Sequence, residues 1–337
     1  MATLSDVAAA AGVSTSAVSR VLSGAPETRV SAATRQRIVD AARQLGYRPN
    51  FAARALKLAR TNVVAVIVPD LTNALFAELM AGVEDQAARL GYMVLLASAE
   101  RLAGERDAIP NLLREGRVDG IVIQPRDAAS SSELESVADS DLPVVLVNSQ
   151  VVGHRGSVLL DDGHGIEVAT RHLVELGHRR IAYLGGEPRS QSAQRRRRGF
   201  VSAMEALGLA IDPAIMTGLG YRPEDGASAL DAVMECNDPP TGVVVANVNA
   251  ALGALLSARR RRIKVPEDIS IVALHDSWTA ETAWPPLTTI RMPLRDLGAA
   301  AISMIDRRIV SGVGDDIVVA DHAPTLVLRE STASAAG

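Results

Sequence analysis

Short apolar runs alternate with helix-length segments along the chain between residue 62 and about residue 290. Each run is six or seven residues long and rich in Val, Ile, Leu and Ala. Strands that are apolar throughout and separated by helices are typical of parallel sheets covered on both faces. We predict strands at residues 63–69, 92–98, 119–124, 143–148, 180–186, 241–247 and 268–274. This series is long enough to form two α/β units.

The strand–helix pattern breaks near residues 149–160, and we expect the chain to return after about residue 290. These two features predict a body, residues 62–337, that folds as two lobes with a cleft between them. The first lobe is expected over about 62–150 and the second over about 160–285, with the chain crossing back after about 290.

The first 47 residues follow helical spacing instead. Thr3 to Asp6 matches a capping box, which marks the start of a helix, and Gly12 suits a left-handed cap at its end. Ser14 and Ser31 are suitable caps for two further helices. The residues expected on the inner faces are Leu4, Val7, Ala8 and Ala11, then Val18, Val21 and Leu22, then Ile38, Ala42 and Leu45. Three helices with a glycine turn before the second predict a helix-turn-helix head over residues 1–47, followed by a hinge helix and linker over 48–61.

Charge separates the two parts further. The whole chain has a formal charge of -4, but residues 1–60 hold nine basic and three acidic residues and carry +6. The remaining residues, with 26 basic and 36 acidic side chains, carry -10. A small basic head on an acidic body suggests that the head meets a polyanion.

The outer face of the second predicted helix has the residue types that can enter a DNA groove. Thr15, Ser16, Ser19 and Arg20 are left outside when the apolar residues face inward. Small polar side chains let a helix approach the floor of the major groove, and one arginine can bind guanine O6 and N7. The alternative is a small helical subdomain with no role in DNA binding, and the excess of basic residues disfavours it.

These segments resemble a known family. "TLSDVAAAAGVSTSAVSRVLSG" and "VSAATRQRIVDAARQLGYRPNFAARAL" are similar to the DNA-binding head of the lactose-repressor (LacI/GalR) family, and a looser similarity continues to about residue 330. The resemblance implies that Thr15, Ser16 and Arg20 read bases, and that phosphates lie near Thr3, Ser14, Ser19 and Ser31. Two positions depart from the family pattern: Ala17 stands where threonine is usual, and Ser23 where asparagine is usual.

The segment "YRPNFAARALKLAR" resembles the hinge of the same family. The resemblance implies that Asn50, Ala53 and Leu56 contact DNA, and that Leu56 is inserted into the minor groove at the operator centre as an apolar wedge. The alternative is that Leu56 only packs within a linker helix.

Polar residues recur just after the predicted strands of the body. Ligands of open parallel sheets bind beyond the carboxyl ends of the strands. The residues at that edge are 70–73, Gln124, Asn148, the segment after Gly186, Asn247, and His275 with Asp276. Amides, carboxylates and a nearby arginine suit a ligand rich in hydroxyl groups.

One arginine of the run Arg195 to Arg198 has the phase to join this set. Phe200, Ala203 and Leu207 share the inner face of a helix that begins near residue 191, and Arg196 lies four residues before Phe200 on the same face. We expect Arg196 over the cleft and the other three arginines on a solvated face.

The family resemblance adds roles to these positions. The motif R-x-x-G of Arg196 and Gly199 implies that Arg196 binds the effector. The other effector-binding positions implied are Asn73 and Phe76 in "NALF", Asn148, Tyr221, Asn247 and Asp276. Gln124 joins them as a predicted effector-binding residue through its strand-end position alone. The family often has an Asp directly after the asparagine at position 247, and this chain has Val248 there.

Enzyme and cofactor motifs are absent from the sequence. The chain has no G-x-S-x-G, no phosphate-binding GxxxxGK[ST] and no paired His or Cys ligands, so we predict no catalytic residues, no metal and no cofactor. There is one cysteine and no signal-peptide or membrane-spanning pattern, which favours a cytoplasmic protein.

The combined prediction is a homodimeric regulator of transcription, a repressor, which binds a pseudo-palindromic DNA operator and responds to a small carbohydrate or polyol between its lobes. An activator on the same scaffold and a sugar-binding module without DNA affinity are the alternatives.

Overall fold

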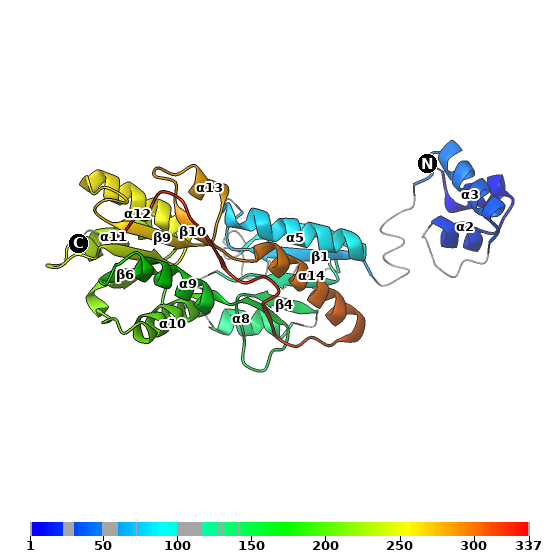
Figure 1. The fold of residues 1–337 in the computed structure, drawn as a ribbon. Helices are drawn as coiled ribbons and strands as arrows, with labels where there is room; N and C mark the ends of the chain where they lie inside the picture. The colour runs from blue at the N-terminus through cyan, green and yellow to red at the C-terminus, as the bar shows by residue number, and fades with distance from the viewer. Residues whose placement is uncertain are drawn as a thin grey trace. The chain divides into compact units, whose positions relative to one another are not determined.

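The computed structural model of the chain describes residues 2–22, 30–48, 60–71, 73–99, 116–126, 129, 131–140 and 142–335 (Figure 1). It separates into two compact units, Met1–Thr61 and Asn62–Gly337. We call them the head and the body and describe each by itself.

The described part of the head contains three helices, α1 (Leu4–Ala11), α2 (Thr15–Leu22) and α3 (Ala32–Gln44). They enclose a small core in which the residues predicted to face inward are buried or packed against it, with one exception. Leu45, expected on the inner face of α3, is 41% exposed. The prediction was wrong there because α3 ends at Gln44, and Ala41 takes the inner position one turn earlier.

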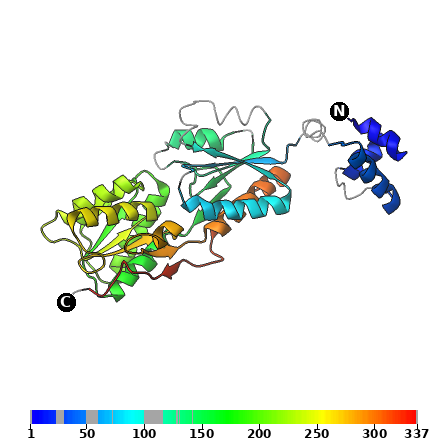
Figure 2. The same ribbon diagram turned by 90° about the horizontal axis from the view of Figure 1, so that it is seen from above.

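The sheet of the first lobe has the order β11-β5-β4-β3-β1-β2, and all its strands are parallel. Its strands are β1 (Val63–Val68), β2 (Met93–Ser98), β3 (Gly120–Ile123), β4 (Val144–Val147), β5 (Ser157–Leu160) and β11 (Ile317–Val319). Helices α5 (Leu75–Leu90) and α14 (Leu294–Ser311) pack together on one face, and α8 (Ser131–Ala138) lies on the other (Figure 2).

The sheet of the second lobe has the order β12-β10-β9-β8-β6-β7. Its strands are β6 (Ile181–Gly185), β7 (Met216–Gly218), β8 (Gly242–Val245), β9 (Ser270–Leu274), β10 (Thr288–Arg291) and β12 (Thr325–Val327). Only β12 is antiparallel to its neighbour in this sheet. The helices form two packed pairs, α9 (Asp162–Glu175) with α10 (Gln191–Ala206) and α11 (Pro223–Met234) with α12 (Val248–Arg261). Two short helices, η1 (Pro213–Ile215) and α13 (Trp278–Glu281), complete the lobe.

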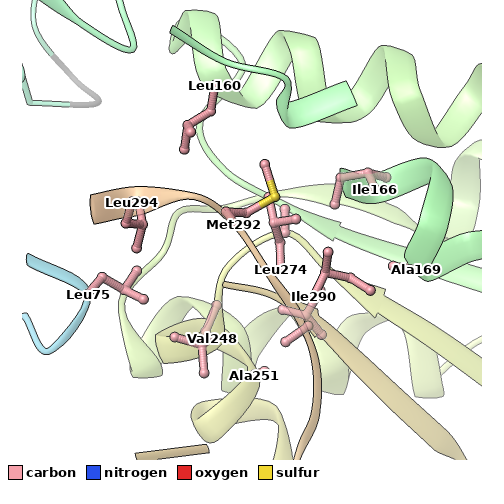
Figure 3. Close-up of a cluster of buried hydrophobic side chains, with 14 of the residues drawn as sticks. Leu75, Leu160, Ile166, Ala169, Val248, Ala251, Leu274, Ile290, Met292 and Leu294 are labelled. Carbon is pink, nitrogen blue, oxygen red and sulfur yellow. The ribbon is translucent and has the colours of Figure 1, made fainter. Parts of the chain in front are cut away.

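The chain passes between the sheets three times: from β5 to α9, from β10 to α14, and from β11 to β12. Side chains at the first two crossings belong to one buried cluster that includes residues of both lobes, whereas residues 320–323 of the third crossing are exposed. Figure 3 shows Leu160, Met292 and Leu294 from the first two crossings with Leu274 and Ile290 of the second sheet. Because these two crossings are buried, the two lobes are joined through core packing as well as through the chain.

The predicted α/β class and all seven predicted strands are confirmed. Five strands were not predicted: β5, β7, β10, β11 and β12. They are three or four residues long and lie at or next to the edge of a sheet, and all of them except β11 mix polar and apolar residues. No helix among the residues described is long and apolar enough to cross a membrane.

Candidate DNA-binding face and ligand cavities

The face of α2 predicted to read bases is exposed. Val18 and Val21 are buried in the head core, so that Thr15, Ser16 and Arg20 point away from it, and Ser19 is half-buried at the margin. The Arg20 Nε donates to the Ser16 carbonyl oxygen at 3.3 Å, which holds the arginine along the helix. This face offers hydroxyl groups and one guanidinium for hydrogen bonding.

Three of the four hydroxyls expected near phosphates cap the N-termini of the three helices. Thr3, Ser14 and Ser31 each accept a backbone N–H through the side-chain oxygen, at 3.3, 3.3 and 3.2 Å respectively. Asp6 completes the capping box, and the hydrogen bond from the Thr3 backbone N–H holds its pKa below the usual range. Helix N-termini favour anions, so all three caps are suitable neighbours for a DNA phosphate. The predicted hinge contacts Asn50, Ala53 and Leu56, and the departure at Ser23, lie outside the described residues.

A small cavity of about 70 Å³ lies at the carboxyl ends of β3 and β4 and the start of α10. Gln124 follows β3, Asn148 and Ser149 follow β4, and Ser190 and Ser192 lie at the N-terminus of α10. The structure therefore brings two of the predicted effector residues, Gln124 and Asn148, to one cavity lined by both lobes. Arg126 and Arg189, which the sequence reasoning missed, also line it.

Asn148 is held in an uncommon conformation at this cavity. Its φ of 54° is in the left-handed region, and its Oδ1 accepts the backbone N–H of Leu160 at 2.9 Å. The other described residue directly after a strand with such a φ is His275, at 71° after β9. Backbone strain of this kind concentrates at functional sites.

Arg196 does not line this cavity and lies inside a buried polar cluster. Its guanidinium is 5% exposed and donates to Asp162 Oδ1 and to the Ala246 carbonyl oxygen, both at 2.9 Å, and to His275 Nε2 at 3.0 Å. The ring of Tyr221 lies 5.1 Å from the guanidinium carbon and packs on Gly186, where a Cβ would fall 2.2 Å from the ring. Most of the donor capacity of Arg196 is thus used by the protein itself.

Electrostatics explain the protonation states in this cluster. Burial opposes the charge on Asp162, but Arg196 and Arg195 outweigh it and lower the pKa of the carboxyl. Burial also opposes the charge on Arg196, and Asp162 raises its pKa above the usual value. Burial first and Arg196 second lower the pKa of His275 to about 3, so its ring is neutral. Because arginine only donates, His275 Nε2 must accept and the ring proton must sit on Nδ1.

Arg195 does not belong to a solvated face, and that prediction was wrong. Its side chain is 18% exposed, donates to Asp162 Oδ2 at 2.9 Å and reaches the Asn148 carbonyl oxygen at 3.1 Å. The helical phase placed its Cα correctly, but the long side chain bends back to the buried carboxylate. Arg197 and Arg198 are exposed as expected.

The other predicted effector residues have partners in their own neighbourhood. Asn73 lies one residue before the N-cap of α5, and its Oδ1 accepts the Leu75 backbone N–H at 3.0 Å. Asn247 is the N-cap of α12, and its Oδ1 accepts the Asn249 backbone N–H at 2.8 Å. Phe76 packs against the core. None of these three lines the 70 Å³ cavity, and neither do Arg196, Tyr221 and Asp276.

Asp276 is held by hydrogen bonds from three side chains. Thr289 and Arg329 donate to its Oδ1, both at 2.8 Å, and Arg291 donates to its Oδ2 at 2.7 Å. Burial works against its charge, but these hydrogen bonds lower the pKa of Asp276 and keep it ionised.

Two family profiles and several known proteins are similar to this chain. Residues 3–50 match the profile described as "Bacterial regulatory proteins, lacI family", and residues 170–332 match "Periplasmic binding protein-like domain". The regulator DegA of Bacillus subtilis (strain 168) is 34% identical over 302 residues, which is 88% of each chain. This chain belongs to the LacI family of bacterial regulatory proteins.

Two further members of the family cover almost the whole chain. The repressor PurR of Histophilus somni (strain 2336) is 33% identical over 334 residues, 98% of this chain and 99% of that protein. The structure of the lac repressor dimer bound to operator and the anti-inducer ONPF is similar with a TM-score of 0.82 at 27% identity, covering 98% of this chain and 99% of that one. The family assignment therefore extends over the head and both lobes.

Asp162 is the buried charged residue of this cluster that sequence reasoning did not find. It lies at the start of α9, directly after the crossing from β5, and its side chain is fully buried. Strand β5 was not among the predicted strands, so nothing in the pattern marked residue 162 as a strand-end position. The sequence feature that could have pointed to Asp162 is the pair of adjacent acids after two leucines in "LLDDG".

Proposed function

We propose that this chain is a transcriptional repressor that binds a pseudo-palindromic operator as a homodimer and releases or tightens its grip when a small molecule binds between its lobes. The observation that carries the proposal is the exposed polar face of α2, with Thr15, Ser16 and Arg20, on a head of charge +6. Membership of the LacI family and similarity to the operator-bound lac repressor dimer support it.

DNA recognition divides between two kinds of contact. Thr15, Ser16 and Arg20 would read base edges in the major groove, where a bidentate arginine–guanine contact discriminates bases by about 1–3 kcal/mol. The capping hydroxyls at Thr3, Ser14 and Ser31, with Ser19, would position the head through phosphates. Asn50, Ala53 and Leu56 complete the proposal as hinge contacts, with Leu56 as the minor-groove wedge.

The ligand we propose for the cavity is a sugar or polyol. Its lining offers three amides, three serine hydroxyls and the guanidinium groups of Arg126 and Arg189. None of the described residues that line it is aromatic, so a planar nucleobase would find no ring to stack on. The effector roles of Asn73, Phe76, Arg196, Tyr221, Asn247 and Asp276 belong to the same proposal.

The size of the cavity suggests how ligand binding would be coupled to DNA binding. Small-molecule pockets are about 300–1,000 Å³, several times larger than the 70 Å³ found here. An effector would therefore have to shift one lobe against the other before it fits. A shift of the lobes that changes the affinity for the operator tenfold needs only about 1.4 kcal/mol of coupling free energy.

Arg20→Ala tests the proposal most directly. An operator is first selected from random duplex DNA, and the dissociation constants of both proteins are then measured at one salt concentration. We expect Arg20→Ala to bind at least about tenfold more weakly and to lose preference at one base position of each half-site. Arg43→Ala, an exposed arginine in the last turn of α3, is the matched control. Unchanged affinity and unchanged preference in Arg20→Ala would remove the base-reading role of α2.

A further inference from the structure

A second and much larger cavity lies on the outward side of α10. Its volume is about 610 Å³, within the range of small-molecule sites. Loop residues 150–155 of the first lobe form one wall, four side chains of α10 form the other, and Asp316 lies between them. Neither the family resemblance nor the proposed effector cavity assigns a role to this space.

Two reciprocal hydrogen bonds between Gln150 and Gln191 join the two lobes at this cavity, and we call this pair the Gln150–Gln191 clasp. The Gln150 backbone N–H donates to Gln191 Oε1, and Gln191 Nε2 donates back to the Gln150 carbonyl oxygen, both at 2.7 Å. Gln150 Nε2 also donates to Asp316 Oδ2 at 2.8 Å, while Asp316 Oδ1 accepts the backbone N–H groups of Gly156 and Ser157. The site is thus held in place before any ligand arrives.

The same contacts decide which groups are left for a ligand. The side-chain amide of Gln191 binds the backbone of Gln150, and the side-chain amide of Gln150 donates to Asp316. Gln194 Nε2 donates to the Pro188 carbonyl oxygen at 2.9 Å. Both oxygens of Asp316 are occupied as well. Amide and carboxylate groups are what a neutral sugar would need, so this cavity is poorly equipped for one.

The side chains of this cavity that remain available to bind a ligand are cationic, and they come from both lobes. Arg198 on α10 is exposed and has no hydrogen bond or ion pair with any residue that the structure describes. Among the described residues, the Arg155 side chain in the first-lobe loop forms an ion pair with Asp315 alone, at 3.2 Å. Both side chains are more than 70% exposed, so water weakens that pair. Arg195 is committed to Asp162. Within the described part of the chain, the buried Nε2 of His154 in the same loop also lacks a hydrogen-bond partner.

We propose that this cavity is a second ligand site, which binds a small phosphate-bearing metabolite through Arg155 and Arg198. Guanidinium groups bind phosphate oxygens through strong, charge-assisted hydrogen bonds. A phosphate between them would connect the first-lobe loop to the second-lobe helix above the Gln150–Gln191 clasp. The bound anion would therefore stabilise one placement of the lobes, independently of a ligand in the effector cavity.

Inorganic pyrophosphate is the probe for this site. Its binding to the full-length protein is measured by titration calorimetry, without divalent cations and with chloride added to keep the ionic strength constant. We expect saturable binding that Arg198→Ala and Arg155→Ala each weaken about tenfold or more. Arg197→Ala is the matched control, because Arg197 is an exposed neighbour on α10 that does not line the cavity, and it should bind as the wild type does.

Several outcomes would overturn the proposal. The absence of saturable binding would do so, as would equal weakening by Arg197→Ala, which would indicate only a general positive field. Binding that survives both Arg198→Ala and Arg155→Ala would belong to the basic head. Binding lost in Arg189→Ala but kept in Arg198→Ala would belong to the 70 Å³ cavity. Equal melting temperatures of all variants without the probe would show that each one is folded.

Discussion

Asp162 organises the buried charges of the second lobe. Its carboxylate is fully buried and accepts hydrogen bonds from Arg195 on one oxygen and Arg196 on the other. Two guanidinium groups share one acid, and the Ala246 carbonyl oxygen and the neutral ring of His275 accept the remaining contacts of Arg196. A buried arginine is tolerated only when its donors are satisfied in this way.

His275 should make the stability of the body depend on pH. Its pKa is about 3 in the folded protein and about 6.5 in an unfolded chain, so the unfolded state binds the additional proton between these values. The free energy of unfolding therefore falls as pH drops below about 6.5 toward 3. Between pH 7.5 and pH 5 we expect the wild type to lose about 2 kcal/mol more than His275→Gln, as measured by urea denaturation.

Glutamine is the informative replacement because its Oε1 can still accept the hydrogen bond from Arg196 but does not titrate in this range. Parallel pH profiles for wild type and His275→Gln would contradict the assignment of a neutral, buried imidazole. A further variant, His275→Phe, removes the acceptor and should be less stable than His275→Gln at pH 7.5, because Arg196 then keeps an unsatisfied donor.

The contact between α5 and α14 depends on two glycines. A Cβ on Gly82 would fall 1.9 Å from the Arg295 carbonyl oxygen, and one on Gly298 would fall 2.2 Å from the Leu79 carbonyl oxygen. The two helix backbones therefore approach so closely that no larger residue fits without a backbone shift. This contact fixes α14, which enters from the second lobe, on the face of the first sheet.

Gly298→Ala should therefore destabilise the body by about 1–3 kcal/mol or more, since overpacking forces the two backbones apart. Chemical denaturation of the body measures the change. The matched control is Gly163→Ala on α9, where the nearest atom to the new Cβ is 3.7 Å away, and we expect it to be neutral or slightly stabilising. Equal effects of the two substitutions would mean that the α5–α14 contact does not require glycine.

In helix α10 the spacing of residues correctly predicted which positions face inward, but it did not predict where every side chain points. The predicted start near residue 191 is confirmed, with Ser190 as N-cap, and Phe200 and Ala203 are buried as the spacing required. The same spacing put Arg196 on the inner face, where it is found. It did not foresee that Arg195 also turns inward, because that depends on a carboxylate 33 positions earlier in the chain.

Operator and effector should influence each other equally across the whole molecule. If effector binding changes operator affinity by some factor, operator binding must change effector affinity by the same factor, because both follow from one coupling free energy. The test is to titrate a ligand found by thermal-shift screening of sugars and nucleobases, with and without saturating operator DNA, and to titrate operator with and without that ligand. A ligand whose affinity is the same with and without operator, while operator affinity changes, would show that the two measurements do not report one equilibrium.

The sequence by itself determined the class of fold, the seven long apolar strands, the caps of the head helices and the polar face of α2. These features depend on residues that are neighbours along the chain: burial repeats with the period of the element, and a cap bonds a backbone group two or three positions away. Only the tertiary structure decided that Asp162 collects Arg195 and Arg196, that His275 accepts from Arg196, and that Gln150 clasps Gln191. These pairs are 33 to 79 positions apart. Asp162, Arg195, Arg196 and His275 meet because α9, α10 and the end of β9 pack together in the second lobe, whereas Gln150 and Gln191 meet because the two lobes lie against each other. The periodic pattern of one element carries no signal for contacts between elements that are distant along the chain.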